Sequence, residues 1–265
     1  DKQDKENKDK EDKDKEKDKE KKKKKKREKS ISGFGGDGKA YPHMLCGVYD
    51  GHFGRQASEW VRILLHLLIL SDPEFESNPK DSFIRAYTDI DFFINLQAES
   101  AGWAPGSTAL TALFYDDKIL LANVGDCQAV LCRNGIAIDL VSPHSPGRLD
   151  EKIRLLQAGV AVEFIGTWRV NGMLAVSRSI GDISYKDSVC PTPEISEVEL
   201  HESDEFLLIA SDGLWDVMTS QDAVEFVINK QKEGKRSKEI CSLLVEKAIQ
   251  LKSTDNVTVV LVGFR

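Results

Sequence analysis

Cysteine is scarce in this 265-residue chain, and no two cysteines are spaced as a motif. The five cysteines are scattered and form no CxxC pair. A disulfide framework and a zinc ribbon both need regularly spaced cysteines, so the sequence argues against both. We therefore expect reduced, chemically inert thiols and a reducing compartment, cytoplasmic or nuclear.

Long hydrophobic runs are also missing. The most apolar stretch, Val61–Leu70, is interrupted by Arg62 and His66 and is too short to cross a bilayer. The charged start of the chain lacks the apolar segment of a signal peptide. No GxxxxGK[ST] sequence is present, so a nucleotide-binding P-loop is unsupported. We expect a soluble monomer that has no membrane partner.

The first 29 residues contain no hydrophobic side chain. They hold 16 Lys/Arg and 11 Asp/Glu, a composition that cannot offset the entropy lost when a backbone becomes ordered. We predict a disordered charged tract and glycine-rich linker over residues 1–40. A solvated helix is an alternative for the tract, and a nuclear address or an RNA contact for Lys21–Arg27.

The remaining 236 residues are acidic, with 21 basic and 33 acidic side chains and a net charge of −12. This balance argues against a nucleic-acid partner for the domain and suits a protein that gathers cations.

Residues 41–265 have the patterning of one globular domain. Helical spacing of apolar residues, or a helix start signal, predicts helices over Gly54–Leu70, Asp81–Gln97, Asp150–Ala158, from Thr219 onward, and Ser237–Leu251. Apolar runs and turn signals predict strands over His43–Tyr49, Thr108–Phe114, Ile119–Val124, Ala129–Arg133, Ile136–Val141, Gly172–Ser177, Glu194–Glu199, Phe206–Ser211 and Asn256–Gly263. Asn134-Gly135 predicts a tight hairpin.

This element order does not alternate as in a parallel sheet. We therefore predict an α/β fold of the α+β type. It is a four-layer α-β-β-α sandwich of two antiparallel sheets flanked by helices, with Trp60/Leu64 and Tyr87/Ile90 buried against the sheets.

Three aspartates lie where apolar strands end or begin. Asp50 and Asp212 each follow a strand and precede a glycine, and Asp255 precedes the last strand. A single aspartate in this position is usually a turn former. Three that converge would supply the oxygen ligands that hard divalent cations need, and Asp126 adds a fourth carboxylate. Both interpretations stay open on the residues alone.

Six motifs in order carry a family resemblance. They are Val48–Gly54 (VYDGHFG), Gly106–Ala109 (GSTA), Ala122–Asp126 (ANVGD), Arg169–Asp182 (RVNGMLAVSRSIGD), Ser211–Asp216 (SDGLWD) and Asp255–Thr258 (DNVT). This ordered set resembles the metal-dependent type 2C protein serine/threonine phosphatases and spans the chain from about Tyr41 to Arg265.

The resemblance implies a two-metal site for Mg²⁺ or Mn²⁺. Asp50 would bridge the two ions, the Gly51 carbonyl would bind one, and Asp212 and Asp255 would complete the other. A metal-bridging hydroxide would then hydrolyse phosphoserine or phosphothreonine in phosphoprotein substrates without a phosphoenzyme.

Further roles follow from the same resemblance. His52 matches the residue that protonates the leaving oxygen, although a histidine in a turn is the alternative. Asp126 and Asp216 match a possible third metal site, and Arg169 matches a substrate-binding arginine. Arg178 and Asp182 match internal braces rather than catalytic residues.

One part of the family pattern is absent. Members normally have an arginine and then a Glu-Asp pair on a strand before the first motif, but Gly33–His43 contains no Arg and no Glu. Either that strand lies upstream of residue 1, or the protein is a catalytically impaired, phosphatase-like binding or regulatory module. A phosphodiesterase that uses the same acidic residues is a minor alternative. Ser142–Pro146 also departs from the family pattern, and we expect a structural role for it.

Overall fold

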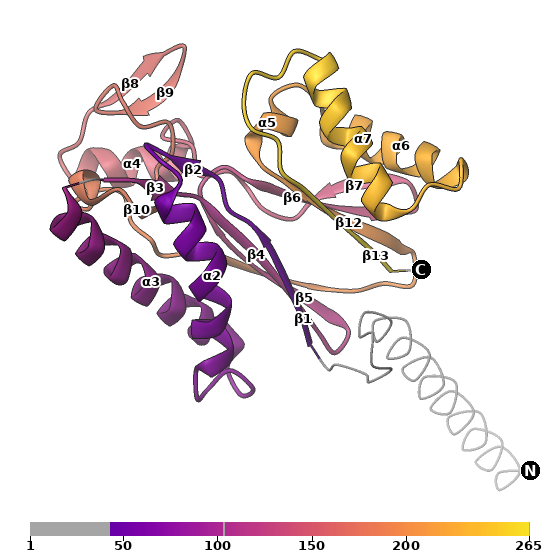
Figure 1. Ribbon diagram of the computed structural model, residues 1–265, viewed down its shortest axis with the longest axis horizontal. Coiled ribbons are helices and arrows are strands. Elements are labelled where there is room, and N and C mark those ends of the chain that lie inside the picture. Colours follow the sequence, from indigo (N-terminus) through magenta and orange to yellow (C-terminus); the bar gives the residue numbers. More distant parts are fainter. Residues whose placement is uncertain (1–42, 103, 265) are drawn as a thin grey trace, which may run out of the picture.

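Two four-stranded antiparallel sheets form the centre of the computed structural model, which describes residues 43–102 and 104–264 (Figure 1). The predicted tract and linker over 1–40 lie outside the described residues. The first sheet has the order β1 (His43–Val48), β4 (Ala109–Tyr115), β5 (Lys118–Val124), β11 (Glu194–Glu199). The second has the order β13 (Val259–Gly263), β12 (Asp204–Ala210), β6 (Gln128–Arg133), β7 (Ile136–Asp139).

The central strands are apolar on both faces because each sheet is covered twice. In β4, Leu110 and Phe114 face the second sheet, where they join a buried cluster with Leu207 and Ile209 of β12. Leu113, one residue out of phase, packs toward the helices. This period of two is the expected consequence of a pleated strand between two apolar layers.

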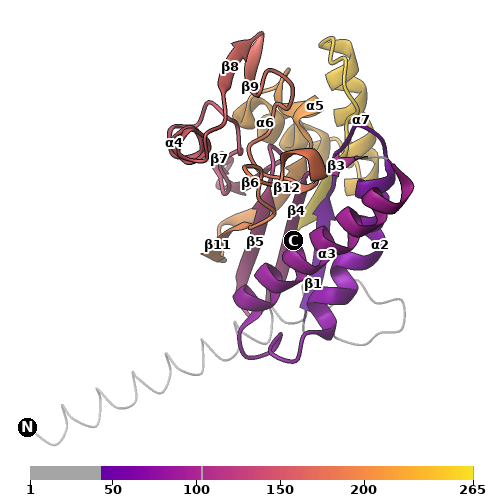
Figure 2. The same cartoon turned by 90° about the vertical axis from the view of Figure 1, so that its left-hand side faces the viewer.

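Helices cover the outer faces of both sheets (Figures 1 and 2). α2 (Gln56–Ser71) and α3 (Pro79–Ala101) pack on the first sheet, and α6 (Ser220–Lys232) and α7 (Ser237–Gln250) pack on the second. The Tyr87 hydroxyl ties α3 to the sheet by donating to the Ala122 carbonyl at 2.9 Å. The predicted four-layer α-β-β-α sandwich is therefore confirmed.

Short elements lie toward one end of the sandwich (Figure 1). A small sheet joins β2 (Gly51–His52), β3 (Gly106–Ser107) and β10 (Ile180–Gly181), three segments far apart in sequence. The others are α4 (Leu149–Gln157), the β8 (Val162–Ile165)–β9 (Thr167–Val170) hairpin, the 3₁₀ turn η2 (Ile183–Tyr185) and α5 (Asp212–Trp215).

Several local predictions need correction. Trp60 is not buried against the sheet: it is 37% exposed and makes an edge contact with Phe93 of α3, at 5.3 Å between ring centroids. Gly172–Ser177 is not a strand, because the backbone turns at Asn171 and Gly172, where φ is 49° and 69°. The Asn134-Gly135 hairpin is confirmed, with φ of 50° and 76° at its two residues.

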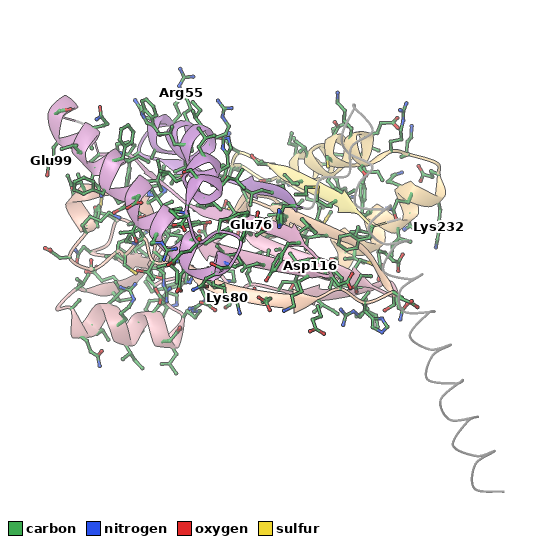
Figure 3. All side chains as sticks on the ribbon, turned by 90° about the horizontal axis from the view of Figure 1, so that it is seen from below. Arg55, Glu76, Lys80, Glu99, Asp116 and Lys232 are labelled. Carbon is green, nitrogen blue, oxygen red and sulfur yellow. The ribbon has the colours of Figure 1, made fainter. Side chains whose placement is uncertain are left out.

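Charged side chains gather on the outside of the helices, as Arg55, Glu99 and Lys232 show (Figure 3). All five cysteines are free thiols, as expected. Within 43–102 and 104–264, no helix has the length and apolar character needed to cross a membrane.

Candidate active site

Asp50 is held by its backbone between the first sheet and the small sheet. Its N–H donates to Thr108 Oγ1 at 3.0 Å, and its carbonyl accepts from the Thr108 N–H at 2.8 Å and from Ser107 Oγ at 3.2 Å. Because the main chain makes these bonds, the carboxylate is left available for another partner. Ser107 and Thr108 of the Gly-Ser-Thr motif provide this clamp.

Asp212 and Asp255 are brought together by the junction between β12 and the loop before β13. The Ser211 N–H donates to the Thr258 carbonyl at 3.1 Å, and Ser253 Oγ donates to the Gly213 carbonyl at 2.6 Å. A Cβ atom at Gly213 would lie 2.4 Å from the Asn256 carbonyl oxygen. Only glycine permits this approach.

Five aspartates from four chain segments interact electrostatically at this place. Burial, together with the charges of Asp126, Asp50, Asp255 and Asp216, raises the pKa of Asp212 from 3.8 to about 8. Burial is also the main cause that raises the pKa of Asp50, and Asp255 adds to it. A crowded set of carboxylates of this kind is the electrostatic environment that a bound cation would neutralise.

The two expected third-site residues belong to the same group. Burial raises the pKa of Asp126 to about 6, and the charges of Asp50 and Asp216 contribute. Burial and the charge of Asp255 raise the pKa of the Asp216 carboxyl. The carboxylates predicted as ligands are therefore near enough to influence one another's protonation.

The donor chemistry fits a hard divalent cation. All the groups offer oxygen, and Asp212 Oδ1 is buried without a hydrogen-bond partner, an arrangement that costs free energy unless a cation or donor binds there. Among the described residues, however, no group of three or more His, Cys, Asp or Glu is already arranged to hold a metal ion. The ligand assignment to Asp50, Gly51, Asp212 and Asp255 stays a prediction.

His52 is oriented by Asp182, which was expected to be an internal brace but was not paired with His52 by the sequence. Its Nε2 lies 2.6 Å from Asp182 Oδ2, and Ser179 Oγ donates to the same carboxylate oxygen. The Asp182 side chain is fully buried. A carboxylate can only accept, so the ring N–H of His52 donates and the ring plane is fixed. The alternative, a histidine bonded to a carbonyl of its own turn, is not what the structure shows.

The lack of a side chain at Gly106 makes this pair possible. A Cβ atom at Gly106 would lie 2.1 Å from His52 Nε2 and 2.2 Å from Asp182 Oδ2. Asp182 itself has a left-handed backbone, with φ of 54°. The pair therefore depends on the small sheet of β2, β3 and β10, whose two-residue strands are too short to give a sequence signal.

The segment that carries Asp182 is anchored to α3. Asp91, only 8% exposed, accepts from the Gly181 N–H at 2.8 Å and pairs with Lys186 Nζ at 2.6 Å. Nothing in the sequence distinguished Asp91 from other helix carboxylates. Its burial on a helix with many polar residues is visible only in the fold.

Arg169 lies on β9 and bonds to backbone carbonyls that are near it in sequence. Its Nη1 donates to the Met173 carbonyl at 2.5 Å. The hairpin occupies the same end of the sandwich as α5 (Figures 1 and 2), but no contact joins Arg169 to the aspartates in the described part of the chain. Its predicted substrate contact stays a prediction.

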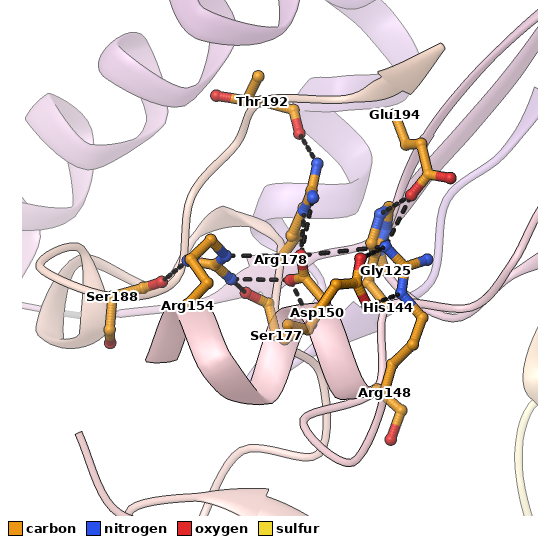
Figure 4. A network of polar contacts seen from close by, with 12 residues as sticks. Gly125, His144, Arg148, Asp150, Arg154, Ser177, Arg178, Ser188, Thr192 and Glu194 are labelled. Atoms are coloured by element: carbon orange, nitrogen blue, oxygen red, sulfur yellow. Dashed lines mark hydrogen bonds and ion pairs between the residues drawn. The ribbon is translucent and has the colours of Figure 1, made fainter. Parts of the chain in front are cut away.

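A buried ionic network joins α4 to the segment that follows β9 (Figure 4). Glu151, 1% exposed, accepts from Arg178, Arg154 and Ser177. Burial alone would raise the pKa of Glu151, but these hydrogen-bond donors lower it to about 2. Arg178 is thus a brace, as expected.

His144 lies in the segment that departs from the family pattern. Its ring accepts a hydrogen bond from the Gly125 N–H and bonds to Glu194. Burial and the positive charges of Arg178 and Arg148 lower the pKa of His144 to about 4.

Comparisons with known proteins agree with this fold. The family model described as protein phosphatase 2C matches residues 9–257. The chain is 43% identical over 220 residues to a probable protein phosphatase 2C 71 of Arabidopsis thaliana, covering 83% of this chain and 48% of that protein. It is 42% identical over 220 residues to a probable protein phosphatase 2C 59 of Oryza sativa subsp. japonica, covering 83% and 66%. The chain thus spans about half to two thirds of the length of these relatives.

Solved structures are similar as well. A C. elegans sex determining protein aligns with a TM-score of 0.78 and 28% identity over 86% of this chain and 58% of that chain. A serine-threonine phosphatase 2C from Toxoplasma gondii aligns with a TM-score of 0.75 over 84% of this chain and 85% of that chain, at 23% identity, which supports the fold.

Proposed function

Because the chain belongs to the protein phosphatase 2C family, we propose that it hydrolyses phosphoserine and phosphothreonine in proteins with the help of Mg²⁺ or Mn²⁺. The observation that carries the proposal is the meeting of five aspartates from four segments around a buried, unpartnered Asp212 Oδ1. Such a concentration of negative charge destabilises the folded protein, and bound cations would offset this repulsion.

Each residue of the site has a distinct task in this proposal. Asp50, the Gly51 carbonyl, Asp212 and Asp255 hold the ions, and Asp126 with Asp216 holds a third, weaker one. When bound, the ions supply positive charge that neutralises phosphoryl oxygens and lowers the pKa of an attacking water.

His52, fixed by its bond to Asp182, gives a proton to the leaving serine or threonine oxygen. Direct attack by water leaves no role for a cysteine nucleophile. This suits Cys127, a fully buried thiol beside the site whose pKa burial raises well above its usual value.

A second candidate function has its own support. No three-residue ligand group is formed in the described residues. A phosphatase-like module that binds phosphoproteins, or regulates a partner, without efficient turnover would fit this observation.

One experiment decides between the two functions. Hydrolysis of a phosphothreonine peptide by the 265-residue chain is measured against Mn²⁺ concentration, with the Asp212→Asn variant as the control for contaminating phosphatases. Saturable, metal-dependent turnover that the variant lacks supports the phosphatase. Peptide binding without turnover at any metal concentration supports the module.

A further inference from the structure

Phe53 combines two features that do not favour folding. Its backbone is in the left-handed region, with φ of 56°, where a bulky residue is strained. Its side chain is 56% exposed, so the ring is largely unprotected from water. A strained position that displays an apolar ring to solvent points to function rather than stability.

The ring of Phe53 contacts the candidate proton donor. The rings of Phe53 and His52 meet edge to face, with centroids 5.4 Å apart and planes at 85°. His52 is itself fixed by Asp182, and Gly54 follows with φ of 126°, so the chain bends just before α2 begins. This turn gives Phe53 a defined place at the edge of the site.

We propose that Phe53 is a specificity-determining residue that contacts an apolar side chain next to the phosphorylated residue of the substrate. The inference rests on the proposed function, in which His52 protonates the leaving oxygen. A group beside His52 then faces the peptide that departs rather than the phosphoryl group that is transferred. An exposed aromatic ring there gains free energy by covering an aliphatic side chain of the peptide.

The test compares two phosphothreonine peptides of equal length and charge, which carry leucine or serine on both sides of the phosphothreonine. Wild type, Phe53→Gly and Phe53→Leu are assayed with saturating Mn²⁺. Phe92→Ala is the matched control, because Phe92 is a 70% exposed phenylalanine on α3. Glycine suits the left-handed backbone, so Phe53→Gly is expected to unfold at no lower a temperature than wild type.

We expect wild type to favour the leucine peptide through a lower KM. Phe53→Gly should raise KM for that peptide about tenfold and change kcat little, which removes the preference. Phe53→Leu should keep part of the preference for the leucine peptide, and Phe92→Ala should keep all of this preference. An unchanged preference in Phe53→Gly, or none in wild type, overturns the proposal.

Calorimetric binding of the same two peptides separates this inference from the proposed function. If wild type hydrolyses neither peptide, the phosphatase proposal fails. A binding preference that Phe53→Gly abolishes still supports the contact, and equal or absent binding of the two peptides by wild type refutes it.

Discussion

Replacing Asp212 by asparagine should stabilise the metal-free protein while it abolishes metal-dependent function. The folded-state pKa of Asp212 is raised from 3.8 to about 8, so the folded protein resists ionisation of this group. The stability that the neutral carboxyl contributes is fully present below about pH 4 and is lost as the pH rises through about 8. Asparagine is neutral at every pH and escapes this loss.

The size of the effect follows from the same shift. Between pH 4 and pH 7 the penalty would reach about 4 kcal/mol at 1.36 kcal/mol per pKa unit, if the shift were felt in full. Asp212 is partly accessible, so water screens its charge, and we expect about 2 kcal/mol.

The assay is urea unfolding of both proteins in chelator at pH 5 and pH 8. Asp212→Asn should be the more stable protein at pH 8, with a smaller difference at pH 5. Asp204→Asn is the control and should lower the free energy of unfolding, because Asp204 is 3% exposed and pairs with Arg133 at 2.7 Å. Added Mn²⁺ should stabilise wild type and leave Asp212→Asn unchanged. If Asp212→Asn is less stable than wild type at pH 8 in chelator, the electrostatic argument is wrong.

Three further outcomes are expected. His52→Gln should lower kcat by ~10²–10⁴-fold and leave the Mn²⁺ concentration for half-maximal activity nearly unchanged; equal losses in both would show that His52 has another role. Glu151→Gln should destabilise the fold by about 3 kcal/mol in urea at pH 7, because it leaves Arg178 and Arg154 without their buried partner. Since the folded pKa of Glu151 is lowered to about 2, this difference should shrink as the pH falls from 4.5 toward 2. Tyr87→Phe should cost about 1–2 kcal/mol in the same assay, because the hydrogen bonds of the hydroxyl with Ala122 and Thr111 are lost while the fold is kept; an unchanged midpoint would contradict it.

The layered fold was predictable because its signals are local. Helical spacing located α2, α3 and α7 within a few residues, and the Asn134-Gly135 turn located the β6–β7 hairpin. Trp60 was placed wrongly because a helical stripe does not distinguish a residue against the sheet from one at the seam with the next helix. That difference depends on where α3 lies.

The sequence indicated candidate residues for the site but not the contacts that hold them in place. Motif order indicated Asp50, Asp212 and Asp255, whereas the Asp182 partner of His52 lies 130 positions away in sequence. Pairings across such distances depend on β2, β3 and β10, and two-residue strands carry no periodicity. The local bond from the Arg169 guanidinium to the Met173 carbonyl was not predictable either, and the substrate contact suggested by its motif stays a prediction.

The way in which the chain assembles the aspartates explains how mutual repulsion is tolerated. Asp50 is fixed by main-chain bonds to Thr108, and the Asp212 and Asp255 segments are joined through Ser211 and Ser253. These bonds use backbone groups and serine hydroxyls and leave the carboxylates unneutralised, although Asp255 Oδ1 accepts a hydrogen bond from the Asn256 N–H at 2.7 Å. A network that neutralised the carboxylates, as the arginines do around Glu151, would be more stable but would leave no charge for a cation. The free energy cost of placing the carboxylates together is therefore felt most at Asp212, whose Oδ1 has no partner. A cation bound at this oxygen would offset that cost and stabilise the folded protein.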